Sequence, residues 1–511
     1  MPEGNFILEV SSVGYKTVTR NVTLKKGKTL EEDFEIEEDA IALDGVVVSA
    51  NRSETTRRMA PTLVNVVDLK LFETTNSSTL SQGLNFQPGV RVETNCQNCG
   101  FQQVRINGLD GPYTQILIDS RPVFSALSGV YGLEQIPASM IERVEVMRGG
   151  GSALFGSSAI AGTINIITKE PLRNSGQLSH TITSLGGSSS FDNNTSLNAS
   201  LVTDDHRAGL YIFGQNRYRS GYDYDGDGFT ELPKLKNQTV GFRSYLKTST
   251  YSKLTFEYHH MQEFRRGGDM LNRPPHEAHI AEQLQHSIDG GSLKFDYFSS
   301  DEKNRLSVFA SAANTDRDSY YGPGNDPLKA YGKTTDLTAM GGAQYVHTFD
   351  KCFFMPSDLT AGLEYNRDRL KDNMWGYNRH TDQTVNIYSA FLQNEWKNDR
   401  WGILIGGRLD KHNMVDNVIF SPRANLRFNP TQNINLRLSY SSGFRAPQAF
   451  DEDMHIENVG GTVAMIERAK DLKEEKSQSF SVSADMYHRF GAFQTNLLIE
   501  GFYTRLTDVF V

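Results

Sequence analysis

Long apolar runs, basic clusters and catalytic motifs are all absent from this sequence of 511 residues. Without about 18 consecutive apolar residues, a membrane-spanning helix is excluded. The 52 lysines and arginines are scattered among 61 aspartates and glutamates, and the net charge is -9, so nucleic acid is not expected as a partner. No Ser/His/Asp series, paired carboxylates or nucleotide motif stands out, and the chain is not expected to be an enzyme.

The first ten residues, MPEGNFILEV, lack the basic and apolar regions of a secretion signal. Glycine and aromatic residues are abundant by contrast. The chain has 44 Gly, 29 Phe and 21 Tyr but only 3 Trp, which suits many short strands joined by turns rather than a helical bundle. A membrane β-barrel stays compatible with this composition, because its strands alternate apolar and polar side chains.

Residues 1–38 form the first compositional unit. Three short alternating runs occur there: Phe6/Leu8/Val10, Val18/Val22/Leu24 and Leu30/Phe34/Ile36. They predict the later part of a small β-sandwich whose first strands are missing, since three strands alone would be marginally stable. Residues 39–60 are typical of a polar linker and contain one apolar patch, Val46–Val48.

From about residue 176 to the end, each predicted strand has an apolar and a polar side. Ile434, Leu436 and Leu438 alternate with Asn435, Arg437 and Ser439. Turns such as NPTQN are tight, whereas connections such as GYDYDGDGFTELPKLKN are long. Serial hairpins with short turns on one rim and long loops on the other are expected for an outer-membrane barrel with a wet lumen. A soluble β-sandwich or propeller is the alternative on pattern alone.

Three motifs carry a resemblance to a known family. The stretch IERVEVMRGGGSALFGSSAIAGTINIITKEP, residues 141–171, resembles the closing segment of the plug domain in TonB-dependent outer-membrane receptors. LDGVVVSANR, residues 43–52, is similar to their energy-coupling box, and SSGFRAP, residues 441–447, looks like their FRAP box. In the first motif, the glycines let the backbone bend sharply and lie close to other backbone. A phosphate-binding loop is the poorer interpretation, because no Lys-Ser/Thr pair follows them.

The resemblance implies a mainly β fold of four parts. An antiparallel transmembrane β-barrel at 172–511 would enclose an α+β plug domain at 61–171. A linker with the TonB box at 39–60 would precede the plug. Residues 1–38 resemble part of the carboxypeptidase-regulatory-like β-sandwich of Bacteroidetes-type receptors. A complete barrel of this family has about 22 strands, of which this chain can supply about 15 to 17, so we expect a chain truncated at both ends.

The coupling box is placed at Asp44, Gly45, Val46, Val47, Val48, Ser49 and Ala50. The resemblance implies that this extended segment pairs with a periplasmic domain of TonB by β-strand addition. Three β-branched residues in a row suit such pairing. From the residues alone, the same valines could form the last strand of the small N-terminal domain.

The resemblance also suggests where cargo would bind. The candidate side chains on the plug and in the lumen are Arg105, Asn107, Tyr113, Arg121, Arg445 and His455. Arginine forks suit the carboxylates and catecholates of an anionic chelate. The alternative is that these residues bind the plug to the barrel wall. Further candidate haem or metal ligands are His276 and His279, with His259, His260 and His286 nearby.

Two of the three cysteines, Cys96 and Cys99, lie in a predicted plug loop with the sequence NCQNCGF. In an oxidising periplasm such a pair predicts a short disulfide that stiffens the loop. Metal capture is the alternative, although two thiolates lack the further ligands of a closed site.

The stretch DYDGDGFTE places Asp223, Asp225, Asp227 and Glu231 at four ligand positions of a calcium loop. Lys234 stands where the bidentate carboxylate of such a loop belongs. The sequence therefore allows two interpretations of this stretch: a loop ordered by Ca²⁺, or a solvated Asp-Gly turn.

Together these features imply a receptor in the bacterial outer membrane for energy-coupled uptake of a scarce metal chelate. The expected cargo is an iron-siderophore or haem, and vitamin B12 (cobalamin) is the alternative. Expected partners are TonB with its inner-membrane complex, outer-membrane lipids, the chelate and, as an open option, a surface lipoprotein. No cofactor is required apart from the optional Ca²⁺. A passive porin, a surface adhesin or a soluble glycan-binding protein would need no coupling box.

Overall fold

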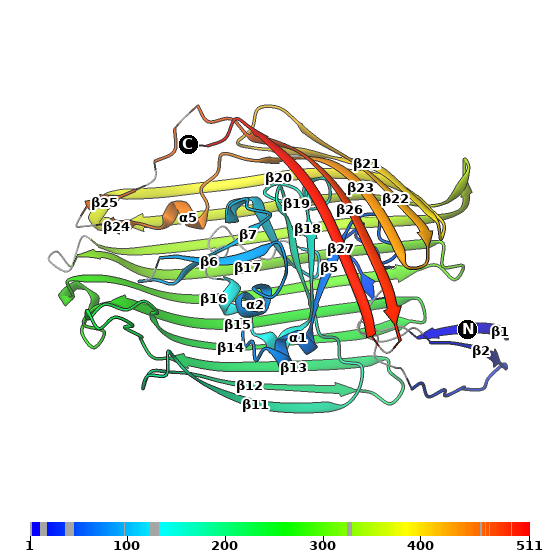
Figure 1. Ribbon diagram of the computed structural model, residues 1–511, viewed down its shortest axis with the longest axis horizontal. Coiled ribbons are helices and arrows are strands. Elements are labelled where there is room, and N and C mark those ends of the chain that lie inside the picture. Colours follow the sequence, from blue (N-terminus) through cyan, green and yellow to red (C-terminus); the bar gives the residue numbers. More distant parts are fainter. Residues whose placement is uncertain are drawn as a thin grey trace.

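The computed structural model describes residues 3–10, 18–35, 45–96, 98–121, 132–323, 330–459, 462–465, 467–469, 471–491 and 493–510. In these residues a large antiparallel sheet curves around a smaller unit of strands and short helices (Figure 1). The N-terminal hairpin projects beyond the end of the sheet where the short turns lie, and α5, β24 and β25 lie at the opposite end (Figure 1).

The large sheet has 15 strands, ordered as in the sequence, and β11 and β27 are its edges. Its strands are β11 Ser175–Ser184, β12 Phe191–Val202, β13 Ala208–Arg219, β14 Lys234–Ser249, β15 Ser252–Gly268, β16 Ile280–Phe298, β17 Asn304–Pro323, β18 Tyr331–Cys352, β19 Met355–Met374, β20 Arg379–Lys397, β21 Trp401–His412, β22 Ile419–Thr431, β23 Ile434–Arg445, β26 Glu475–Phe490 and β27 Phe493–Thr507. The antiparallel hairpin series predicted from the alternating pattern is confirmed.

The large sheet forms the wall around the smaller unit. The long connections between its strands contain a few short elements. They are η3 Pro275–Glu277, η4 Trp375–Tyr377, α5 Asp451–Met454, β24 Glu457–Val459 and β25 Thr462–Ala464.

The enclosed unit is the predicted plug. Its four-stranded sheet has the order β5-β9-β10-β8, and β8 pairs with β10 in parallel. Its elements are β5 Val64–Asp68, α1 Leu69–Thr74, α2 Leu80–Leu84, β6 Val90–Cys96, β7 Phe101–Ile106, η1 Gly111–Tyr113, β8 Thr114–Ile118, α3 Gly132–Gln135, η2 Ala138–Met140, β9 Ile141–Arg148, α4 Ser152–Phe155 and β10 Gly162–Thr168. The strand predicted to end at Arg148 is confirmed as β9.

No helix in the described part of the chain is long and apolar enough to cross a membrane.

Side chains of the large sheet are sorted in the sense opposite to that of a soluble protein. The outward positions are apolar and exposed, and include Leu363, Leu392, Phe420, Leu438, Val482 and Ile499. The inward positions are polar and buried, and include Arg217, Arg265, Asp410, Arg427 and Asp485. Neighbouring residues of a strand point to opposite faces. The alternation of apolar and polar residues in the sequence therefore puts the apolar side chains outside and the polar side chains inside. An apolar outside around a polar inside is the arrangement that lipid requires.

The N-terminal hairpin differs from its prediction. β1 Gly4–Val10 pairs with β2 Val18–Leu24, but the described residues 28–35 form no third strand, and Ile36 lies outside the described residues. The third run is broken by three consecutive acidic residues, Glu31 to Asp33. Side chains hold this segment instead: Arg20 pairs with Glu32, and its guanidinium lies 4.6 Å above the ring of Phe34.

Glycines after β9 lie where backbones approach closely. Gly162 has φ of 153°, and a Cβ there would stand 2.3 Å from the carbonyl oxygen of Met147. A Cβ at Gly150 would stand 1.9 Å from the hydroxyl of Ser441 in the FRAP box. This close approach confirms the role predicted for the glycines, and it seats the end of the plug against β23.

We predict that Leu363→Arg destabilises the protein folded in lipid vesicles by about 2–4 kcal/mol, because it would bury a charge in the hydrocarbon layer. Leu363 lies in the middle of β19 with its side chain 67% exposed on the outer face. The matched control is Val418→Arg, at an exposed position in the connection before β22. Denaturant titration should separate the two variants, and equal losses would contradict the outward-facing assignment.

Candidate functional site

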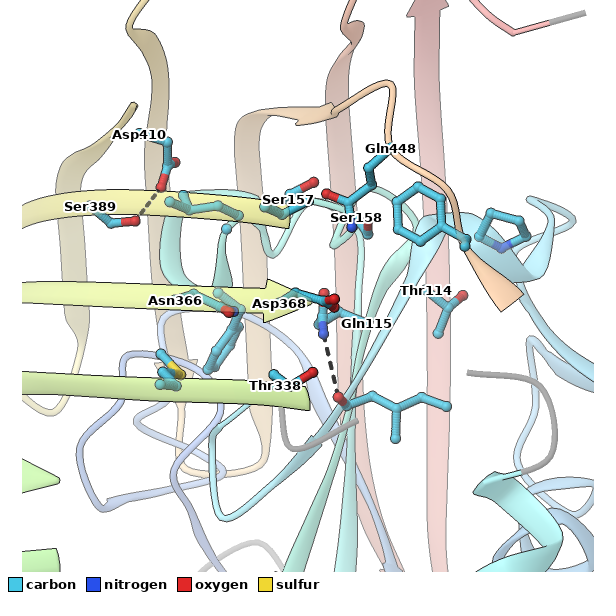
Figure 2. Close-up of a pocket in the computed structure, with 18 of the residues that line it drawn as sticks. Thr114, Gln115, Ser157, Ser158, Thr338, Asn366, Asp368, Ser389, Asp410 and Gln448 are labelled. Carbon is cyan, nitrogen blue, oxygen red and sulfur yellow. Dashed lines mark hydrogen bonds between the residues drawn. The ribbon is translucent and has the colours of Figure 1, made fainter. Parts of the chain in front are cut away.

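A cavity of about 170 Å³ lies between the plug and the wall (Figure 2). The plug contributes the segment from Thr114 to Ile116 and the turn after α4, which carries Ser157 and Ser158. The wall contributes inward side chains of four consecutive strands, β18 to β21, among them Asn366 and Ser389. Gln448, just after the FRAP box, closes one side. Most of the labelled side chains end in hydroxyl or amide groups (Figure 2).

The charged groups around the cavity are largely engaged with one another. Arg408 donates to Glu364 at 2.7 Å and to Asp410 at 2.8 Å, and Ser389 donates to Asp410 at 2.6 Å (Figure 2). The lining holds three carboxylates, with Asp368 the third, and the guanidinium of Arg408, while Arg52 brings a second guanidinium to Glu364. The cavity is therefore rich in neutral hydrogen-bonding groups, and its guanidinium groups are engaged by carboxylates.

Tyr113 and Arg445 meet at the plug–wall contact. The Tyr113 hydroxyl donates to Glu475 at 3.1 Å, and Arg445 lies 3.7 Å from the same carboxylate. The guanidinium of Arg445 also lies 4.5 Å above the ring of Phe450. Burial and the nearby Glu475 carboxylate raise the pKa of Tyr113 to about 12. These two candidates fasten the plug to the wall, as the alternative interpretation of the sequence allowed.

The other candidates on the plug lie apart. Arg105 is paired within the plug, at 2.6 Å from Glu93 and 2.9 Å from Asp110. Arg121 is buried with its guanidinium 4.9 Å above the ring of Phe309. Asn107 occupies a left-handed turn with φ of 54°. The structure does not bring these three side chains to one ligand site with Arg445.

Cys96 and Cys99 are not joined by a disulfide in the structure, contrary to the predicted bond. Each sulfur instead faces a polar partner from outside the plug. Cys96 donates to Glu282 of β16 at 3.2 Å, and Cys99 lies 3.4 Å from Nε2 of His455. The nearest ligand atoms of all four side chains lie within 4.8 Å of one another.

Short contacts within this group of four shift the pKa values of two of its members. A hydrogen bond from Cys99 outweighs burial and lowers the pKa of Cys96 to about 7. Burial alone would lower the pKa of His455, but hydrogen bonds to Cys96 and Glu282 raise it to about 10.

The predicted coupling segment is docked rather than free, apart from Asp44, which lies outside the described residues. β3 Val46–Val47 pairs with β4 Thr55–Thr56. One carboxylate oxygen of Glu145, in β9, accepts from the backbone N–H of Val48 and of Ser49, both at 2.9 Å, and from the Ser49 hydroxyl at 2.7 Å. The linker prediction is corrected accordingly, because Val47, Ser49 and Ala50 are buried.

The acidic loop brings its four carboxylates together. Oxygens of Asp223, Asp225, Asp227 and Glu231 lie within 4.8 Å of one another. Backbone N–H groups of the same loop donate to all four, for example that of Gly226 to Asp223 at 2.7 Å.

The predicted histidines have separate partners. His276 contacts the Tyr331 hydroxyl at 2.8 Å, His279 contacts Asp269 at 2.5 Å, and His286 lies 3.6 Å from Glu263. Within the described residues, neither of the two groups of clustered metal-ligating side chains includes them.

Sequence reasoning missed the glutamates that organise these contacts: Glu145, Glu282 and Glu475. Each is buried. No motif marks these glutamates. The only available signal for them was a single carboxylate at a strand position that the alternating pattern assigns to the inner face.

Two family models match the chain. The model described as the TonB dependent receptor-like β-barrel covers residues 162–511, and that of the TonB-dependent receptor plug domain covers residues 56–163. The chain therefore belongs to the TonB-dependent receptor family. Members of this family are outer-membrane receptors and not enzymes, and the chain is an outer-membrane protein.

Curated relatives include vitamin B12 transporters named BtuB from Vibrio vulnificus. The protein of strain CMCP6 is 24% identical over 425 residues, which cover 80% of this chain and 64% of that protein. The protein of strain YJ016 is 33% identical over 174 residues, which cover 33% of this chain and 28% of that protein. The chain thus spans less than two thirds of the length of these relatives.

Solved structures show the same fold. The siderophore receptor PirA from Acinetobacter baumannii matches with a TM-score of 0.71 and 18% identity, over 88% of this chain and 78% of that one. A mutant of the ferric enterobactin receptor PfeA from Pseudomonas aeruginosa matches with a TM-score of 0.71 and 18% identity, over 88% of this chain and 71% of that one.

Replacing Glu145 tests whether its carboxylate holds the coupling segment. We expect Glu145→Ala to speed hydrogen exchange at the amides of Val48 and Ser49 by about tenfold or more, since a hydrogen bond to a charged group contributes roughly 1.5–3 kcal/mol. Exchange would be followed by mass spectrometry of the intact protein. Glu73→Ala is the control, because Glu73 is an exposed carboxylate of the plug in α1. Unchanged exchange in Glu145→Ala would contradict the role of the Glu145 carboxylate in holding Val48 and Ser49.

Proposed function

We propose that this chain belongs to a receptor that takes up a scarce metal chelate across the outer membrane with energy delivered by TonB. The observation that carries this proposal is the docking of the coupling segment onto the plug. Glu145 in β9 and Asn165 in β10 both bind Ser49, so tension on this segment would act directly on the central strands of the plug.

In this proposal TonB adds a strand to the segment from Asp44 to Ala50. Strand addition satisfies the backbone N–H groups of the recognised segment with carbonyl groups of the partner. The amides of Val48 and Ser49 would then exchange the Glu145 carboxylate for carbonyl acceptors on TonB. Release of Glu145 would loosen the sheet of the plug and open a path beside it.

The proposed cargo is an iron-siderophore that is neutral or positively charged. The guanidinium of Arg408, which lines the cavity, is already engaged by Glu364 and Asp410 and is therefore not available to an anion. The arginines predicted to bind an anionic chelate are engaged elsewhere: Arg105 with Glu93 and Asp110, and Arg445 with Glu475. Haem, with its two carboxylates, has correspondingly less support.

Vitamin B12 is the second candidate cargo. Its corrin ring carries neutral amide groups, which match the amides and hydroxyls of Gln115, Asn366 and Gln448 and of the serines in the cavity. The two curated relatives are named as vitamin B12 transporters, which adds weight to this candidate.

Uptake into cells that express the intact protein tests the proposal. Cells would receive a radiolabelled cationic ferric hydroxamate, cyanocobalamin, an anionic ferric catecholate or haem. We expect accumulation of one of the first two compounds. Val46→Pro should abolish accumulation while leaving surface binding intact, because proline removes a backbone N–H from the half-exposed start of the segment and disfavours strand addition. Asn366→Ala should weaken binding of that compound by about fivefold, the effect of losing one hydrogen bond of about 1 kcal/mol.

Arg105→Ala serves as the control for cargo charge and should bind the compound as the unaltered protein does. Uptake of only the anionic compounds, or a loss of binding in Arg105→Ala, would refute the charge argument. Uptake that survives Val46→Pro would refute energy coupling.

We also propose that the acidic loop binds Ca²⁺ through Asp223, Asp225, Asp227 and Glu231. Four carboxylates within 4.8 Å supply the hard oxygen ligands that Ca²⁺ prefers. Calorimetric titration of the intact protein should show one Ca²⁺ site that Asp223→Asn weakens at least tenfold. The control is Asp205→Asn, at an exposed turn aspartate that accepts from Thr203. No heat of binding, or the same loss in both variants, would leave the loop as an ordinary turn.

A further inference from the structure

The loop of Cys96 and Cys99 is held against the wall by two features of the chain. In the β6–β7 hairpin, Gly100 has φ of 69° and donates to the carbonyl of Cys96, which turns both cysteines toward the wall. At the wall, a Cβ on Gly267 would stand 1.8 Å from the carbonyl oxygen of Asn98. The missing side chain at Gly267 therefore admits the plug loop to the surface of β15.

Glu282 is brought to this point by strand register. It is the residue of β16 that pairs with Gly267, and on its other side it pairs with Tyr321 of β17. Its carboxylate is 3% exposed and reaches the Cys96 sulfur at 3.2 Å. The space left by Gly267 for the cysteine loop thus lies directly beside Glu282, whose carboxylate contacts Cys96.

His455 arrives from the long connection after β23 and is firmly positioned. Arg379 of the wall donates to the backbone carbonyl of Met454 at 2.8 Å, which anchors the preceding residue. The imidazole packs against two aromatic rings, with its centroid 5.2 Å from that of Phe101 and 5.5 Å from that of Tyr321. Its Nε2 is 3.4 Å from the Cys99 sulfur and 3.5 Å from the Glu282 carboxylate.

We propose that Cys96, Cys99, Glu282 and His455 form a four-coordinate Zn²⁺ site that fastens the outer loop of the plug to the barrel wall. Two thiolates, an imidazole and a carboxylate are the donors that Zn²⁺ takes in proteins, and a Cys-x-x-Cys pair is a common source of two of them. This site is separate from the cavity proposed for cargo and does not depend on the identity of the cargo.

The spacing of the donors suits a tetrahedral ion. With Zn–N and Zn–O bonds of about 2.0–2.1 Å and Zn–S bonds of about 2.3 Å, tetrahedral ligand atoms lie roughly 3.3–3.8 Å apart. The measured separations of 3.2, 3.4 and 3.5 Å are close to this range, and no pair exceeds 4.8 Å. Four protein donors leave no open position, which is typical of a structural rather than a catalytic site.

Charge favours Zn²⁺ over a monovalent soft ion. Two thiolates and a carboxylate carry three negative charges into a buried setting, where Cys99 and His455 pack with Phe101, Tyr321 and Ile456. A divalent ion neutralises two of these charges, whereas Cu⁺ would neutralise only one. Because an uncompensated buried charge is costly, the divalent ion is the better match.

Metal analysis of the intact protein purified with reductant tests the site. We expect one zinc ion per chain, and Cys96→Ser with Cys99→Ser, or His455→Gln alone, should lower zinc affinity by roughly 100-fold or more. Cys352→Ser is the matched control and should keep the zinc, since Cys352 lies at the opposite, short-turn end of β18. The heat-dependent shift in electrophoretic mobility of a folded barrel would show that each variant has folded.

Cobalt gives a readout that loss of folding does not imitate. Co²⁺ in place of zinc should give the intense visible bands and the thiolate-to-cobalt charge transfer of a tetrahedral sulfur site, and both should vanish in the cysteine variant. Zinc should also slow hydrogen exchange at the Gly100 amide. The proposal is overturned if zinc is absent, if the cysteine variant keeps it, or if Cys96 and Cys99 of the protein isolated from membranes form a disulfide that persists with zinc.

Discussion

The polar inner face of the wall is the constraint on which the rest of the structure depends. Buried guanidinium groups must find acceptors, because an unpaired charge inside a protein costs several kcal/mol. The plug supplies them from its backbone: Arg408 donates to the carbonyl of Leu154, Arg423 to that of Ala50 and Arg437 to that of Ala60, at 2.9–3.1 Å. Plug and wall therefore satisfy each other's hydrogen-bonding groups. The position of the plug is set by these polar contacts and not by apolar packing alone.

The same kind of contact governs how the plug can be released. Val48 and Ser49 are held through one carboxylate of Glu145 and not through a full strand ladder. A partner that adds a strand offers replacement acceptors for these amides, so the exchange need not leave buried N–H groups unsatisfied. At the other end of the plug, the group of Cys96, Cys99, Glu282 and His455 provides a second attachment, to the wall and to the connection after β23.

Local pattern predicted much of the fold and little of the site. The alternation in β22 and β23 and the glycines after Arg148 carried enough information to place strands and close approaches, because both are properties of a few neighbouring residues. The predicted third N-terminal strand does not form within the described residues 28–35, where three acidic residues interrupt its apolar run. The predicted disulfide is wrong because Cys96 and Cys99 stay thiols, which interact with each other, with Glu282 of the wall and with His455 of the connection after β23. Arg105 and Arg445 were correctly placed on plug and wall, but carboxylates that no motif marks engage them.

The sequence by itself determined the sidedness of the wall, since a period of two assigns every strand residue to lipid or lumen. It also determined the order of the hairpins, since short turns permit only neighbouring strands to pair. Only the tertiary structure decided which lumen residues meet the plug. Cys96 and Glu282 are 186 residues apart in the chain, and Cys99 and His455 are 356 apart. Such contacts depend on the depth and rotation of the plug inside the wall, and no local periodicity encodes either quantity.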